Sequence, residues 1–133
     1  MIKFRKMHPV LIMPRFYSGE KCTGSECEDI SWHGTALNEP GWEKDDGCLA
    51  ALINGVFGKY NGYEGDCDFY MLFNTSGEDR IFSLPESPSG REWHISINTG
   101  ETDGRDIFIE NVGPPAGRET ITVKSRSLIV LTA

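Results

Sequence analysis

The chain has 133 residues, with 20 acidic and 13 basic side chains, a net charge of −7 and 38% hydrophobic residues. This length and composition predict one soluble domain with a single core and disfavour intrinsic disorder. The acidic balance argues against nucleic acids and anionic membranes as partners, because both select clustered Lys and Arg. No stretch reaches the roughly 20 apolar residues of a membrane span, and the apolar run near the start is too short for a signal peptide, so we expect a cytoplasmic location.

Residues 1–13 form a helix-like segment that has no helical or sheet partner of its own. Proline disfavours helical geometry in the residue before it, so Pro9 ends the helix near His8. A helix that cannot bury its apolar face is not expected to exist alone in water. We therefore expect this segment to be the remnant of a helix from an upstream domain. Without that domain it should fold back on its own sheet, self-associate or fray.

Residues 14–46 predict an irregular linker, because six Pro and Gly residues are spread among many polar ones. From residue 47 onward, short apolar runs alternate with turn signals. In the run 66–74, Cys67, Phe69, Met71 and Phe73 share one apolar face. The predicted strands cover residues 48–57, 66–74, 80–85, 92–98, 106–112, 120–124 and 127–132.

The last two of these strands are expected to form a tight pair. The absence of an intervening helical pattern predicts an all-β fold, an antiparallel Greek-key β-sandwich over residues 47–133.

The cysteines do not follow a metal-binding spacing. Only one pair is close in sequence, with a four-residue gap, and a disulfide within that pair is disfavoured in a cytosolic protein. Paired aspartates occur near predicted turns, but the spacing of an EF-hand ligand set is absent. We therefore expect no metal and no cofactor, and we interpret the four cysteines as plain thiols: Cys22, Cys27, Cys48 and Cys67.

The sequence contains no recognised catalytic motif, and no acid–base pair stands out among the 20 acidic residues. The aromatic side chains are more informative, because an exposed ring can cover the apolar face of a sugar. We interpret Trp42, Tyr60 and Tyr63 as candidate glucan-binding residues. Trp32 and Trp93 have rings of the same kind, but a tryptophan in a sandwich is more often a core or interface residue, and this alternative applies to all three tryptophans.

Several segments, in order, resemble bacterial glycogen debranching enzymes and isoamylases of the alpha-amylase superfamily. Residues 4–11, Phe-Arg-Lys-Met-His-Pro-Val-Leu, resemble the end of the last barrel helix in that family. Residues 29–34, Asp-Ile-Ser-Trp-His-Gly, and then 40–42, Pro-Gly-Trp, resemble the segment that leaves the barrel. The strands of the family's C-terminal β domain are matched, in order, by residues 49–55, 68–74, 90–93 and 125–131.

In this family the catalytic carboxylates lie on the barrel, so the resemblance places no catalytic residue on this chain. It implies a non-catalytic C-terminal domain of an enzyme that hydrolyses α-1,6 branch linkages in glycogen or starch-like glucans. Such a domain would pack on the catalytic barrel of the same parent chain and guide the glucan polymer. The residues expected at that interface are Ile2, Phe4, Met7, Val10, Leu11, Trp32 and His33. A stand-alone carbohydrate-binding module is the main alternative, and a complete small enzyme is the third.

Overall fold

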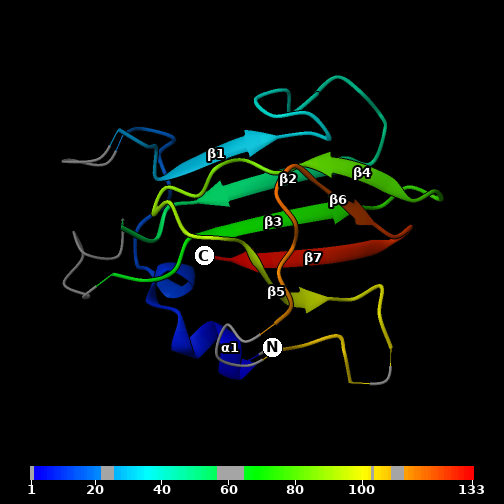
Figure 1. Cartoon of the computed structure of the whole chain (residues 1–133). Coiled ribbons are helices and arrows are strands. Elements are labelled where there is room, and N and C mark those ends of the chain that lie inside the picture. Colours follow the sequence, from blue (N-terminus) through cyan, green and yellow to red (C-terminus); the bar gives the residue numbers. More distant parts are fainter. Residues whose placement is uncertain (1, 22–25, 57–64, 103, 109–112) are drawn as a thin grey trace.

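The computed structural model describes residues 2–21, 26–56, 65–102, 104–108 and 113–133, which form two antiparallel sheets after a short helical start (Figure 1). The larger sheet has the order β1-β2-β3-β7-β5, and the smaller one pairs β4 with β6. The bounds are α1 Ile2–Met7, η1 (a 3₁₀ turn) Pro9–Ile12, β1 Ile30–His33, β2 Cys48–Ile53, β3 Phe69–Asn74, β4 Arg80–Ser83, β5 His94–Asn98, β6 Thr120–Val123 and β7 Ser127–Thr132. The predicted all-β antiparallel sandwich is confirmed.

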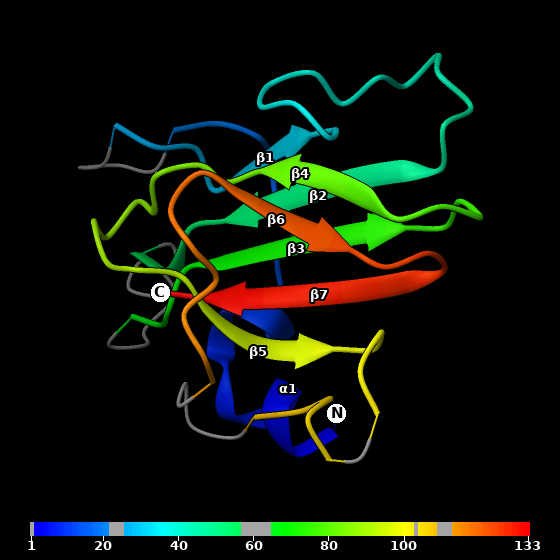
Figure 2. The same cartoon turned by 45° about the vertical axis from the view of Figure 1, so that its right-hand side comes forward.

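The main core lies between the two sheets. Figure 2 shows β4 and β6 crossing one face of the larger sheet. Alternate residues of the central strands point toward them, as the two-residue period of a strand requires. Phe82 of β4 and Val123 of β6 are both fully buried against this inner face. The inner-face residues that complete this cluster on β2, β3 and β7 are Cys48, Ala50, Tyr70, Leu72, Ile129 and Leu131.

A second core covers the opposite, outer face of the larger sheet. Val10 of η1 is fully buried there, and Phe4 of α1 meets Phe69 edge to face with ring centroids 6.1 Å apart. The sheet contributes further buried residues to this cluster: Ile30, Ala51, Ile53, Ile97 and Val130. The N-terminal segment therefore folds back on its own sheet, which is one of the three outcomes expected for it.

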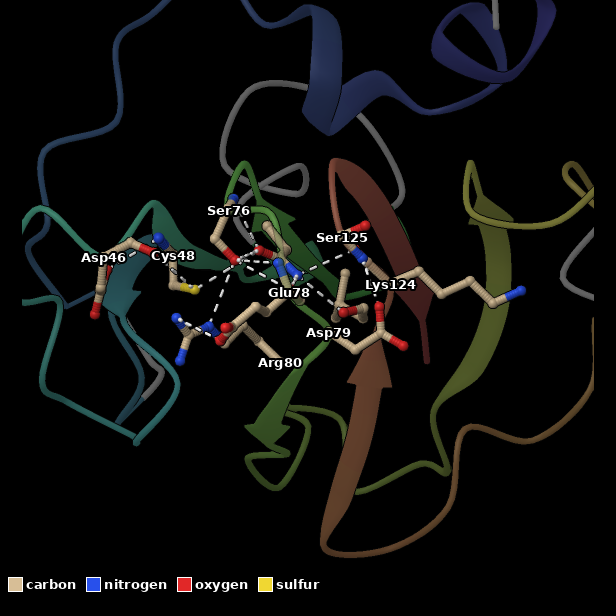
Figure 3. Close-up of polar contacts among 10 residues, drawn as sticks. Asp46, Cys48, Ser76, Glu78, Asp79, Arg80, Lys124 and Ser125 are labelled. Carbon is tan, nitrogen blue, oxygen red and sulfur yellow. Dashed lines mark hydrogen bonds and ion pairs between the residues drawn. The ribbon is translucent and has the colours of Figure 1, made fainter.

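Two of the connections at which the chain changes sheets, β3–β4 and β6–β7, are neighbouring turns. Buried Asn74, at the end of β3, donates from Nδ2 to the carbonyl oxygens of Glu78, Val123 and Lys124 at 2.8–3.1 Å. The backbone N–H of Ser125 also donates to Asp79 Oδ1 at 2.9 Å, so the two turns lie side by side (Figure 3). The expected tight pair over 120–132 is wrong: β6 pairs with β4, and β7 pairs with β3 and β5. These side-chain bonds hold the β6–β7 turn as a crossover between the sheets.

Two other segments differ from the expected pattern. Strand β1 lies inside the predicted linker 14–46 and pairs with β2 along its whole length. The strand expected over 106–112 is reduced, in the part that the structure describes, to a single bridge between Ile107 and Ile97; residues 109–112 lie outside the described ranges. Neither helix of the described chain has the length or apolar character needed to cross a bilayer.

Candidate functional site

The N-terminal segment leaves four apolar side chains in water even though its other face is buried. Phe16 is 99% exposed and Ile2 is 75% exposed, while Met7 and Ile12 are each 43% exposed. We call these four residues the N-terminal surface. Their exposure has a cost in water, because each large apolar side chain gains roughly 1.5–3 kcal/mol when it is fully buried. The surface therefore has the properties of an interface.

A group of hydrogen bonds, which we call the polar clamp, ties the segment that carries this surface to the rest of the chain. His8 Nδ1 donates to Asp66 Oδ1 at 2.7 Å, and the backbone N–H of Val10 donates to Asp66 Oδ2 at 3.2 Å. The Tyr17 hydroxyl donates to the carbonyl oxygen of Val10. Burial alone would lower the pKa of His8, but the hydrogen bond and charge of Asp66, together with Cys67, raise it to about 9. At neutral pH His8 is therefore protonated and forms an ion pair with Asp66.

The same cluster has metal-ligating chemistry, since ligand atoms of His8, Asp66 and Cys67 all lie within 4.8 Å of one another. An imidazole binds a metal through an unprotonated nitrogen. The nitrogen that faces Asp66 and Cys67 is Nδ1, which carries the proton of the ion pair at neutral pH. Asp66 Oδ1 also accepts the backbone N–H of Cys67 at 2.8 Å. The cluster is thus built as a structural clamp between the N-terminal segment and the start of β3.

An aromatic pair lies at the β1 edge of the larger sheet. Trp32, on the outer face of β1, is 40% exposed, and Trp42, in the loop that follows, is 67% exposed. Their ring centroids are 5.6 Å apart and the ring planes are inclined by 63°. A shallow hollow of about 390 Å³ adjoins Trp42 and is also lined by Lys44, Asp45 and Asp46. We call Trp32 and Trp42 the tryptophan pair.

The loop that carries Trp42 is fixed at both ends. At its start, His33 Nδ1 accepts the backbone N–H of Asn38 at 2.8 Å, and burial of the ring lowers the pKa of His33, which keeps this nitrogen unprotonated. A Cβ on Gly34 would lie 2.4 Å from the carbonyl oxygen of Glu39, so only glycine allows the loop to close here. At its end, the Gly47 carbonyl oxygen accepts both the N–H and the hydroxyl of Thr75.

The structure separates the residues that the sequence assigned to one interface. Ile2 and Met7 are exposed on the N-terminal surface, whereas Val10 and His33 are buried in the chain's own structure. Phe4 and Leu11 pack against the outer core. Trp32 lies beside Trp42, which was assigned to glucan binding.

Of the other predicted glucan-binding residues, Tyr60 and Tyr63 lie outside the described residues. Ile12 and Phe16 belong to the N-terminal surface but were not singled out by sequence. The run Met13-Pro14-Arg15-Phe16 held the only signal for Phe16, an aromatic residue in a polar stretch.

The most buried carboxylates are engaged in backbone hydrogen bonds. Asp29 accepts the N–H groups of Ser18, Gly19 and Ile30 at 2.7–2.8 Å. Asp68 accepts those of Gly55 and Ser89, each at 2.8 Å. Asp29 and Asp68 therefore act as structural acceptors that tie loops to the sheet.

Comparisons with known proteins identify relatives among the isoamylases, and no protein-family model matches the chain. An isoamylase of Pseudomonas amyloderamosa is 28% identical over 116 residues, which cover 82% of this chain and 13% of the relative. An isoamylase of a Flavobacterium species is 25% identical over 147 aligned positions, which cover 100% of this chain and 18% of the relative. The chain thus spans less than a fifth of the length of the curated relatives it matches. The chain is therefore similar to a part of these isoamylases.

Proposed function

We propose that this chain is the non-catalytic C-terminal domain of an isoamylase-type debranching enzyme. The parent enzyme would hydrolyse α-1,6 branch linkages in glycogen or starch-like glucans. The domain would pack on the catalytic barrel of the same parent chain. The observation that carries the proposal is the N-terminal surface, where Ile2, Met7, Ile12 and Phe16 are exposed on a segment that is itself anchored.

The anchoring distinguishes this surface from a frayed end. Val10 is fully buried and Asp66 bonds both His8 and the Val10 backbone, so the backbone between α1 and η1 is held against the sheet. An anchored backbone loses less conformational entropy than a frayed one when a partner covers the segment. The match to relatives five to eight times longer is consistent with a partner domain in the same chain.

The non-catalytic role is supported by how the described carboxylates are used. Asp29, Asp66 and Asp68 are each committed to two or more hydrogen bonds with backbone or His8. A glycosidase needs a carboxylic acid and a second carboxylate roughly 5–10 Å apart on either side of the scissile bond. Incubation of the purified chain with glycogen, amylopectin and pullulan should therefore release no reducing sugar above a boiled control. Release that one acidic substitution in this chain abolishes would contradict the proposal.

The docking itself is tested with the parent's catalytic barrel produced separately. Sedimentation velocity should show a complex of the barrel with this chain, and Phe16→Ser combined with Met7→Ser should abolish that complex. Ile81→Ser is the matched control, because Ile81 is 64% exposed on β4, away from the N-terminal surface. A complex that survives the double substitution, or that Ile81→Ser removes, would place the interface elsewhere.

The second candidate is a carbohydrate-binding role for the domain, and the tryptophan pair is the observation that favours it. Trp42 is 67% exposed and Trp32 is 40% exposed, and an exposed indole can cover the apolar face of a sugar. Docking and sugar binding are compatible, because the two surfaces use different residues.

A further inference from the structure

We propose that the tryptophan pair, Trp32 and Trp42, is a binding site for a curved, neutral sugar chain of the α-1,4-glucan type. The proposal deepens the proposed function, since it names the residues with which this domain would hold the polymer of its parent enzyme. It assigns Trp32 to the ligand, whereas the sequence assigned it to the interface with the barrel.

The position of the pair separates it from α1, which carries Ile2 and Met7. Strand β1 is one edge of the larger sheet, and in both views α1 lies beyond β5, the other edge (Figures 1 and 2). Phe16 lies closer to β1, because Ser18 and Gly19 bond Asp29. A partner seated on α1 therefore leaves the tryptophan pair available for an occupant of its own.

The exposure of the rings leaves room for a stacking ligand. The two indoles meet edge to face with centroids 5.6 Å apart, an ordinary contact of two aromatic rings. Trp42 remains 67% exposed and Trp32 40% exposed, so both present ring surface to a ligand. Because the ring planes are inclined by 63°, a straight chain does not lie flat on both, whereas a chain that curves from one sugar to the next, as α-1,4 linkages do, can meet each.

The charge around the pair selects against other ligands that stack on aromatic rings. Single-stranded nucleic acids also stack on exposed aromatics, but they require a basic groove. Here the hollow beside Trp42 carries Asp45 and Asp46 with one cation, Lys44, on a chain of net charge −7. Carboxylates and an ammonium group are suitable partners for sugar hydroxyls, which both donate and accept hydrogen bonds. The site therefore fits an uncharged polyhydroxyl chain.

The site is also preorganised. Trp32 is fixed by the β1–β2 register opposite Ala51, and the Trp42 loop is held by His33 at its start and by Thr75 at its end. A fixed site pays less ordering entropy on binding. Two stacked sugars still supply little free energy before the cost of association, so we expect a dissociation constant of about 1 mM.

The test is a titration of the whole chain with maltoheptaose. Binding is monitored by indole fluorescence and by the chemical shifts of the indole N–H groups. We expect saturable shifts at the Trp32 and Trp42 side chains. Trp42→Ala and Trp32→Ala should each weaken maltoheptaose binding about tenfold. Trp42→Phe, which keeps an aromatic ring, should weaken it less. Cellohexaose, which is straight, should bind at least several-fold more weakly, and a thymidine oligonucleotide should not bind.

Controls distinguish a lost site from a lost fold. Ile81→Ala removes an exposed apolar side chain on β4 and should leave maltoheptaose binding unchanged. Trp42 is 67% exposed, so Trp42→Ala should leave the urea midpoint nearly unchanged. Indole shifts that do not respond to maltoheptaose, or equal binding of cellohexaose, would overturn the inference. If Trp42→Ala instead abolishes the complex with the barrel, the pair is part of the docking interface and the inference is wrong, whereas the proposed function stands.

Discussion

The clamp between His8 and Asp66 predicts a stability that depends on pH. The pKa of His8 rises from 6.5 to about 9 on folding. At about 1.4 kcal/mol per pKa unit, this shift corresponds to about 3 kcal/mol of folding free energy. The His8 side chain is 11% exposed, and solvent screening reduces the expected contribution to about 2 kcal/mol. Because the folded pKa is the higher one, this stability is fully present below pH 6.5 and is lost as pH rises through about 9.

Asp66→Asn removes the charge and keeps the shape of the side chain. We expect it to lower the free energy of unfolding by about 2 kcal/mol at pH 6, because the amide also turns a donor toward the Val10 N–H. Above pH 9.5 the ion-pair part of this difference should be lost, and only the pH-independent cost of the misplaced donor at Val10 should remain. The assay is urea unfolding between pH 6 and pH 10, together with hydrogen-exchange protection of the Val10 amide.

His8→Asn is the matched control, because its amide can still donate to Asp66 but does not titrate. Its stability should lack the fall between pH 6.5 and 9 that the natural chain shows. If Asp66→Asn and the natural chain lose stability in parallel over this range, the ion pair does not stabilise the fold and the reasoning fails.

Three further predictions concern the sheet and its turns. Asn74→Ala should lower the free energy of unfolding by about 2–4 kcal/mol in urea, because three carbonyl groups lose a buried donor; a loss below 1 kcal/mol would contradict this. Gly55→Ala should lower the free energy of unfolding by more than about 2 kcal/mol, since its Cβ would lie 2.2 Å from the Asp66 carbonyl oxygen. Gly77→Ala, in open space, should lower it by less than about 0.5 kcal/mol. Equal losses would contradict the close approach of Gly55 to Asp66. Burial raises the pKa of Cys48, so its thiol should react with a disulfide reagent far more slowly in the folded chain than in urea; equal rates would show that it is accessible.

The sequence predicted the sandwich because its strands are short apolar runs separated by turn signals. In β3, Phe69 and Met71 belong to the outer core and Tyr70 and Leu72 to the inner one, so its continuous apolar run corresponds to a sheet covered on both faces. Strand β1 could not be predicted in the same way. It has four residues, of which Ile30 and His33 are buried and Trp32 is exposed, and a pattern this short has no measurable period.

The site and the crossover depend on contacts that are distant in sequence. Nothing near Asp66 indicates that its carboxylate bonds His8, 58 residues earlier. Likewise, the short gap between β6 and β7 favoured a hairpin, and only the side chain of Asn74, 49 residues before Val123, makes it a crossover. Trp32 and Trp42 were each recognised as aromatic candidates, but their pairing depends on how the loop between them closes.

Strand order in the larger sheet has a consequence for the way the chain folds during translation. Strand β7 lies between β3 and β5, yet it pairs with β3 residues that were synthesised 53 to 63 residues earlier. At about 5–20 residues per second, β3 waits roughly 3–12 s for that neighbour. During this interval the edge of β3 that later pairs with β7 is open to other nascent chains, although the earlier N-terminal segment can already cover its outer face. We therefore expect a chaperone that shields extended apolar strands to improve the yield of this domain more than lower temperature alone does.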